Sequence, residues 1–201
     1  MSRKSVPRHK ACRRLSLSVC GAVNCPLGRR PNPPGQHGAG RKNKPSQYAL
    51  QLRETQKLRA YYNVSAKQML RYYDEASASK AQTNVAMVQK LETRLDSMVY
   101  RLGFAASLRA SRQMVGHGHI LLNGKKVNKP AIQIKPGDQI KLREKSQKVD
   151  RYKEWWGFYD HNLPYIQKNK GDFSGTLVAQ PERDAIPIVV EDQLVVEFMA
   201  R

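Results

Sequence analysis

The positions of hydrophobic residues predict helices over the middle of the chain. A ragged apolar face that begins after Ser46 indicates one helix, and Asn63 would end it because asparagine tolerates a positive φ. Ser65 and Gln68 are spaced as a capping box, which predicts the start of a second helix. We assign the apolar residues of these helices to the core.

Two more helices are expected further along. Apolar residues at spacings of three and four predict one continuous helix over residues 84–102, which Gly103 would end. Ser107 can cap a short helix that ends at Gly116.

Strand signals follow these helices. Asn123 and Gly124 are the preferred pair for a tight turn, so the surrounding residues predict a β-hairpin. The sequence PGD at residues 136–138 separates two alternating runs and predicts a second hairpin. Near the end, residues 185–190 and 193–200 are expected to form short strands or extended packing segments.

This pattern predicts an α+β protein with a helical N-terminal domain and a compact helix-helix-hairpin module. We expect a basic arm over residues 1–45, a helical domain over 46–91, the module over 92–154, and a C-terminal segment over 155–201 that packs back on the protein. The pattern gives no structure or role for residues 155–175.

The net charge of the chain indicates what kind of partner this fold binds. The formal net charge is +20, and the pI is near 10.2. Self-repulsion of this size opposes a compact state, and a polyanionic partner relieves it, so we expect nucleic acid first and a membrane surface only distantly. The sequence has no apolar run of membrane-spanning length and no secretory signal, so a reducing cytosol is expected. Acidic residues prevail after Gly171, so the C-terminal segment is expected to meet protein and not phosphate.

Residues 26–45 are rich in proline, glycine and basic side chains, which exclude the interior of a helix or sheet. They are either a disordered linker or a basic arm that becomes ordered on RNA. The concentration of charge favours the arm.

The module is rich in side chains that can bind phosphate. Arginine grips phosphate with two parallel hydrogen bonds, and lysine acts as a point charge. The alternative is a solvated charged face. The basic residues are Arg94, Arg101, Arg109, Arg112, Lys125 and Lys126, and the neutral donors are His117, His119, Asn123 and Asn128.

Aromatic side chains are scarce in the module. Only Tyr100 and Phe104 lie between Arg94 and Lys148. A protein that binds single strands usually offers aromatic surfaces for stacking. The scarcity therefore favours folded RNA, recognised by its shape, phosphates and 2′-hydroxyls.

The run LETRLDSMVYRLGFAASLRASRQMVGHGHILLNGKKVN resembles the RNA-binding module of the small-subunit ribosomal protein uS4 family. That module also occurs in some pseudouridine synthases, tyrosyl-tRNA synthetases and heat-shock proteins. The runs RRPNPPGQHG and ETQKLRAYYNVSAKQMLRYY are similar to the family's N-terminal segments, and the ending QLVVEFMAR also fits. The chain departs from the family pattern at Asn32, usually an aromatic, at Asn63, usually a glycine, and at residues 129–132.

This resemblance implies a structural protein that binds small-subunit ribosomal RNA at a junction of several RNA helices and nucleates assembly there. It further implies contact with the neighbouring protein uS5, a place beside the path by which mRNA enters, and an effect on translational accuracy. The setting would be a cytoplasmic bacterial ribosome, with an organellar ribosome left open, and neither a membrane nor a small-molecule substrate is implied. By the resemblance, the RNA-contacting residues would be Arg29, Arg30, Gln36 and His37 in the arm, and Arg94, Arg101, Arg109, Arg112, His117, His119, Asn123, Lys125 and Lys126 in the module.

All three cysteines lie in one stretch, HKACRRLSLSVCGAVNC. Three thiols cannot all pair within one chain, and a reducing compartment argues against disulfides. Some family members hold a zinc ion with four N-terminal cysteines, and a set of three thiolates and one imidazole is a common structural zinc site. By that resemblance the zinc ligands would be His9, Cys12, Cys20 and Cys25. The alternatives are a site that has lost its zinc and an Fe–S cluster with one histidine ligand.

No enzyme is expected, because the sequence contains no nucleophile–base pair, carboxylate dyad or glycine-rich phosphate loop. One rival class is an RNA-modifying enzyme such as a pseudouridine synthase, but the residues after Asp150 are too few for its catalytic domain. A second rival is a zinc-bearing DNA regulator, which would prefer duplex DNA to structured RNA.

Overall fold

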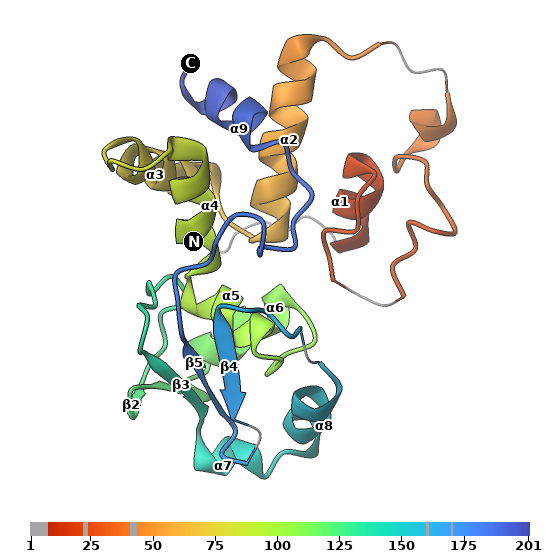
Figure 1. Ribbon diagram of the computed structural model, residues 1–201. Helices are drawn as coiled ribbons and strands as arrows, with labels where there is room; N and C mark the ends of the chain where they lie inside the picture. Colours follow the sequence, from red (N-terminus) through yellow and green to blue (C-terminus); the bar gives the residue numbers. More distant parts are fainter. Residues whose placement is uncertain (1–7, 22–23, 41–43, 160, 170) are drawn as a thin grey trace. The chain divides into compact units, whose positions relative to one another are not determined.

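The structure is a computed structural model that describes residues 8–21, 24–40, 44–159, 161–169 and 171–201 (Figure 1). The chain divides into two compact units, which are described separately. The first unit runs to Arg71 and includes Val190–Arg201, and the second unit is Tyr72–Val189. Parts of the expected arm, residues 1–7 and 41–43, lie outside the described residues. Among the described helices, none is both long and apolar enough to cross a membrane.

The first unit is helical. Its elements are α1 (Arg8–Leu15), the 3₁₀ turn η1 (Gln36–Ala39), α2 (Gln47–Tyr61), the start of α3 (Ala66–Ser77) and α9 (Asp192–Met199). Ser46 caps α2, accepting a hydrogen bond from the Ala49 backbone N–H at 3.3 Å. Asn63 has a φ of 50°, as expected for the residue that ends this helix.

The capping box of α3 is confirmed. The Gln68 backbone N–H donates to Ser65 Oγ at 3.2 Å, and the Ser65 backbone N–H donates to Gln68 Oε1 at 3.4 Å. These two bonds satisfy backbone donors that the first turn of a helix leaves unpaired.

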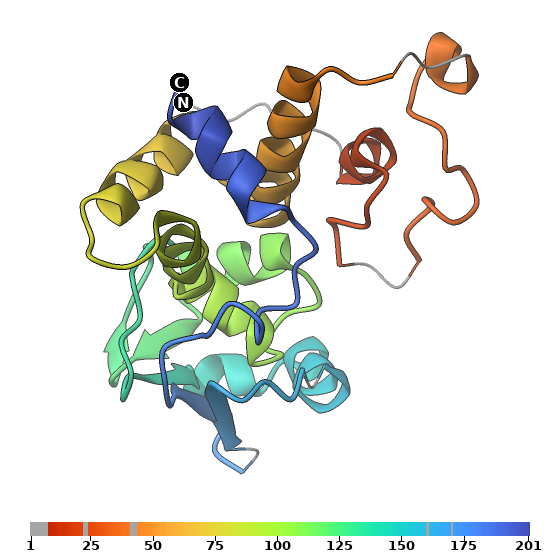
Figure 2. The same cartoon turned by 45° about the horizontal axis from the view of Figure 1, so that its top comes forward.

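Residues 193–200, predicted as a short strand or an extended packing segment, lie largely in the helix α9, so that prediction is wrong. Both views show α9 beside α2 (Figures 1 and 2). Gln51 Nε2 donates to Glu197 Oε2 at 2.8 Å, and the rings of Tyr48 and Phe198 lie 5.7 Å apart. A short apolar run is compatible with the periodicity of a helix or of a strand, and here packing on α2 favours the helix.

The second unit begins with a broken helix where one continuous helix was predicted. The segments are α4 (Thr83–Glu92) and α5 (Leu95–Arg101), followed by α6 (Leu108–Gly116). At the break, the Leu95 N–H donates to the carbonyl of Ile132 and the Ile134 N–H donates to that of Thr93, each at 2.8 Å. Pairing with this distant segment outweighs the helical periodicity.

An antiparallel sheet of order β2-β1-β3-β5-β4 completes the second unit (Figure 1). The first predicted hairpin is confirmed, since Asn123 and Gly124 have φ values of 49° and 78° in the turn between β1 and β2. The second is wrong, because β3 pairs with β1 and β5. The strands are β1 (Ile120–Leu122), β2 (Lys125–Lys126), β3 (Gln139–Leu142), β4 (Ile166–Asn169) and β5 (Ser174–Leu177).

Residues 155–175, for which the sequence predicted no structure, extend the module's sheet and core. The chain continues through α7 (Glu144–Gln147) and α8 (Asp150–Phe158) into the β4–β5 hairpin. Trp156 stacks on Phe104 with ring centroids 4.4 Å apart. Gly175 lets β5 approach α5, since a Cβ there would lie 2.3 Å from Leu102 Cδ2.

Candidate nucleic-acid interface and metal centre

Exposed lysines form one edge of the sheet in the second unit. Lys125 and Lys126 make up β2, and both are exposed. The Lys126 side chain crosses Gly118, where a Cβ would lie 2.3 Å from Lys126 Cε. Lys126 therefore lies beside the loop that carries His117 and His119.

The two histidines differ in environment. His117 is exposed at the end of α6, while His119 is partly buried with its Nδ1 2.9 Å from Ser146 Oγ. Burial lowers the pKa of His119, and the charges of His117, Arg143 and Lys126 lower it further. At neutral pH His119 is therefore a neutral hydrogen-bonding group and not a cation.

Asn123 shapes the turn between β1 and β2. Its Nδ2 donates to Asp138 Oδ1, and its Oδ1 accepts from the Gln139 backbone N–H, each at 2.8 Å. These bonds give Asn123 a structural role at the hairpin, next to the exposed lysines.

Helix α6 presents two arginines. Ser107 caps the helix by accepting from the Ala110 backbone N–H at 3.3 Å, as predicted. Arg109 and Arg112 are both partly exposed. Arg112 Nη1 lies 3.9 Å from Asp96 Oδ2, and its side chain remains 28% exposed. Both guanidinium groups can meet phosphate at the surface.

Arg94, predicted to contact RNA, is fully buried. Its Nε and Nη2 donate to the two carboxylate oxygens of Asp96 at 2.9 and 2.6 Å, and its Nη1 donates to Tyr72 Oη at 2.7 Å. Burial alone lowers the pKa of Arg94, but the hydrogen bonds and charge of Asp96 outweigh it and raise the pKa. In this conformation the charged side chain cannot reach a phosphate, and it holds α5 and α3 together.

Arg101 is buried in the same way. It donates to both carboxylate oxygens of Glu92, and Tyr165 Oη donates to the same carboxylate at 2.8 Å. The Glu92 carboxylate thus accepts three hydrogen bonds, two from Arg101 and one from Tyr165, and the buried Arg101–Glu92 ion pair has a structural role. Arg101 therefore also lies outside any phosphate-binding surface in this conformation.

The predicted arm residues of the first unit are exposed. The backbone N–H groups of Arg29 and Arg30 both donate to the Pro26 carbonyl, at 3.2 and 2.8 Å, which forms a turn. Gln36 and His37 are exposed on η1. All four side chains are open to a partner.

The cysteine stretch folds into a cluster of thiols in the first unit. The ligand atoms of His9, Cys20 and Cys25 all lie within 4.8 Å of one another. Cys12 is fully buried on α1, outside this group, but its thiol interacts with both Cys20 and Cys25. None of the three cysteines forms a disulfide within the described part of the chain.

The interactions among the three thiols favour the binding of a cation. The pKa of Cys12 is raised to about 12, first by burial and then by hydrogen bonds with, and the charges of, Cys20 and Cys25. A bound metal ion stabilises thiolates that otherwise repel one another. Zinc–sulfur bonds of about 2.3 Å would place tetrahedral donors roughly 3.7 Å apart, so the observed group needs only a small contraction. The donor set therefore fits zinc.

Sequence reasoning missed two aromatic side chains near the histidines. Tyr152 and Trp155 lie on α8 and pack against the rim of the core. The ring of Tyr152 lies 5.5 Å from that of His119. The run DRYKEWW contained the signal, but the count of aromatics stopped at Lys148, before this helix.

Comparisons with known proteins agree with these features. A family described as "Ribosomal protein S4/S9 N-terminal domain" matches residues 3–92, and one described as "S4 domain" matches residues 93–140. The small ribosomal subunit protein uS4A of Symbiobacterium thermophilum is 42% identical over the full length of both chains. The uS4 proteins of Natranaerobius thermophilus and Chlorobaculum tepidum are 40% and 43% identical, covering 100% and 96% of both chains.

Proposed function

Because the chain belongs to the small ribosomal subunit protein uS4 family, a family of structural proteins and not enzymes, we propose how its own residues bind ribosomal RNA. Its role is that of a structural component of the small subunit. The relation covers the full chain, including both units. This observation carries the proposal, and the exposed cations support the surfaces that we propose for RNA.

The second unit offers the main RNA surface. Arg109 and Arg112 on α6 supply two guanidinium forks, and Lys125 and Lys126 supply point charges on the hairpin. His117 and His119 lie between them and add hydrogen bonds to sugar or phosphate. Ten phosphate contacts would make affinity fall by several orders of magnitude over a modest rise in salt.

The arm of the first unit adds a second contact. Arg29, Arg30, Gln36 and His37 are exposed on a segment with little core of its own, which suits binding along a phosphate backbone. Two separate basic surfaces on one chain favour a folded RNA that presents several helices, over a single duplex.

The finer role follows from this arrangement. A protein that holds several RNA helices at once would nucleate assembly of that region of a bacterial, cytoplasmic small subunit. With the neighbouring protein uS5 it would lie beside the path by which mRNA enters, and support translational accuracy. The acidic C-terminal part offers a surface for protein contact.

The test is a competition experiment with the full chain. Labelled small-subunit ribosomal RNA is bound first, and unlabelled duplex DNA or ribosomal RNA is added at the same salt concentration. We expect ribosomal RNA to displace the label at a concentration at least tenfold below that of DNA. Equal competition, or failure of the chain to co-sediment with small subunits at high salt, would contradict the proposal.

The thiol cluster is proposed to hold one structural zinc ion, with His9, Cys12, Cys20 and Cys25 as its ligands. The approach of three suitable donors, with the Cys12 thiol interacting with two of them, in a segment with a small core supports this. Zinc would supply folding energy to the first unit and no chemistry.

Metal removal tests the zinc proposal. Purified protein should contain about one zinc ion per chain, and a chelator should lower the melting temperature and make all three thiols reactive. Cys20→Ser should lose the metal, whereas Ser18→Ala, whose hydroxyl lies 3.9 Å from the Cys20 sulfur, should keep it. Less than half an equivalent of zinc with freely reactive thiols would instead indicate idle cysteines, and visible absorption with bound iron would indicate an Fe–S cluster.

A further inference from the structure

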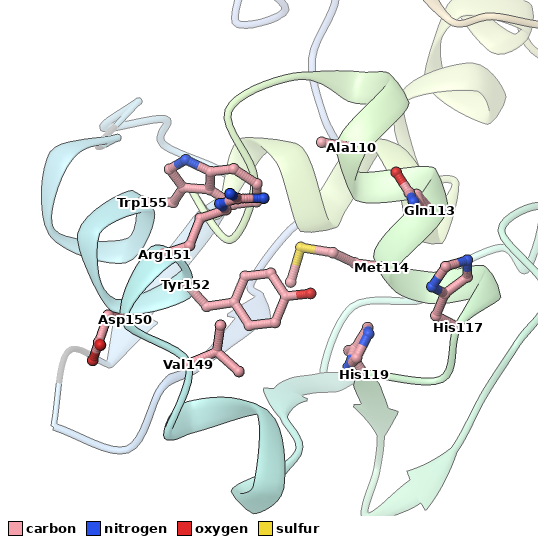
Figure 3. A pocket seen from close by; sticks show the side chains of 10 residues that line it. All are labelled: Ala110, Gln113, Met114, His117, His119, Val149, Asp150, Arg151, Tyr152 and Trp155. Carbon is pink, nitrogen blue, oxygen red and sulfur yellow. The ribbon is translucent and has the colours of Figure 1, made fainter.

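A hollow of about 400 Å³ opens on the second unit beside the histidines (Figure 3). It is lined by one face of α6 from Ala110 to Met114, by the two histidines that follow this helix, and by Val149 and the first two turns of α8. A volume of this size accommodates a planar ring system, and the residues that line it combine aromatic, apolar and polar groups.

Aromatic rings form one wall of the hollow. Tyr152 lies 5.7 Å from Trp155 and 5.5 Å from His119, measured between ring centroids. Figure 3 shows the Tyr152 ring directed from α8 toward α6 and Met114. Met114 is buried, and both α8 rings pack against the core, so their positions are fixed before any ligand arrives. Rings held in this way lose little freedom when a planar group stacks on them.

Polar side chains stand at the rim. Gln113, His117 and Arg151 are exposed and line the same hollow. Within the part of the chain that the structure describes, their side chains make no hydrogen bond. Their donors and acceptors can therefore pair with the edge of a ligand, and Arg151 adds a positive charge.

The hollow adjoins the proposed RNA surface. Gln113 follows Arg112 directly on α6, and Arg109 lies one turn earlier. Lys126 crosses Gly118, between the two histidines that line the hollow. A phosphate backbone held by these cations would run past the opening, with its bases within reach.

We propose that this hollow takes one unstacked nucleobase of the bound RNA, which stacks on Tyr152 and Trp155 while its edge meets Gln113 and His117. The inference rests on the function proposed above and adds a base-stacking contact to recognition by shape and phosphate. Unstacked bases of loops and bulges are the parts of a folded RNA that aromatic side chains take up.

Substitution of the two rings tests the inference. In Tyr152→Leu/Trp155→Leu the apolar contact with the core remains but the stacking surface is lost, and affinity for small-subunit ribosomal RNA should fall roughly tenfold or more. The slope of log affinity against log salt should stay unchanged, because no phosphate contact is removed. The matched control is Phe158→Leu on the same helix, which is 74% exposed, does not line the hollow and should bind as the wild type does.

A second measurement identifies the base. Ultraviolet crosslinking of the wild-type complex, followed by mass spectrometry, should join one nucleotide to the peptide that carries Tyr152 and Trp155. Replacing that nucleotide by an abasic site should weaken wild-type binding and leave the affinity of the double variant unchanged.

The outcomes separate this inference from the function on which it rests. If the wild type does not prefer ribosomal RNA, the proposed function fails. If the wild type binds but the folded double variant binds equally well, the inference fails and the function stands. Normal binding of naked RNA with lost incorporation into subunits would also overturn the inference, because the hollow would then receive a protein.

Discussion

Two arginines of different exposure meet the Asp96 carboxylate. Arg94 is fully buried and binds both carboxylate oxygens, whereas Arg112 keeps 28% of its side-chain surface and lies 3.9 Å away. The same residue type is therefore structural at one position and, at the other, available for the RNA contact proposed above. Burial decides which, because a guanidinium group must be at the surface to meet phosphate.

Arg94→Met should destabilise the second unit strongly. The substitution leaves the Asp96 carboxylate buried without its bidentate partner, and breaking such a pair costs about 3–5 kcal/mol. Urea denaturation measures this change in the free energy of unfolding. Arg112→Met is the control, with a change below about 1 kcal/mol and weaker RNA binding. If the Arg94→Met protein has unchanged stability but fails to bind RNA, the structural role is wrong and Arg94 contacts RNA.

His119 should make stability depend on pH. Its pKa is lowered in the folded state, mainly by burial, so the unfolded chain binds the proton more tightly. The stabilisation is complete above the ordinary histidine pKa of about 6.5 and is lost as the pH falls below that value. Urea denaturation at several pH values should show a steeper acid loss for the wild type than for His119→Gln. Parallel profiles for the two proteins would contradict this.

At the scale of elements, the features that depend on nearby residues were predicted correctly, whereas those that depend on pairing with distant residues were not. The caps by Ser65 and Ser107, the end of α2 at Asn63 and the turn at Asn123 depend on nearby residues, and all four are as predicted. The break between α4 and α5 depends on hydrogen bonds to residues 132 and 134, which no periodicity reveals. The same holds for α9, whose helical form is selected by packing on α2.

The close approach of β5 to α5 predicts a steric effect. A Cβ at Gly175 would meet buried Leu102 at 2.3 Å, so Gly175→Ala should destabilise the second unit by about 1–3 kcal/mol. In Gly175→Ala/Leu102→Ala the total loss should be smaller than the sum of the two single losses, because truncation of Leu102 removes the clash. The matched control is Gly157→Ala in α8, where a Cβ meets nothing within 4 Å. Thermal or urea unfolding measures all three, and an unaffected Gly175→Ala protein would refute the packing.

For the whole molecule, composition predicted the class of partner, and the structure divides the candidate RNA-binding residues into buried and accessible ones. A net charge of +20 indicated a polyanion, and the resemblance narrowed it to small-subunit ribosomal RNA. Neither could separate buried Arg94 and Arg101 from partly exposed Arg109 and Arg112, because the exposure of each arginine depends on tertiary packing. Tyr152 and Trp155 of α8 were missed for a related reason, because only the folded structure brings their rings close to the histidines.

The central claim is that exposed cations of the second unit grip the phosphates of ribosomal RNA. The most direct measurement is the salt dependence of affinity for Arg109→Gln/Arg112→Gln/Lys125→Gln/Lys126→Gln. Each lost phosphate contact lowers the slope of log affinity against log salt by about 0.7–0.9, so the fourfold variant should lose roughly three units. A control of equal charge neutralises exposed lysines outside the proposed surface: Lys80, Lys135, Lys148 and Lys153. The account predicts a much smaller change for this control, and it is contradicted if both variants, or neither, change the slope.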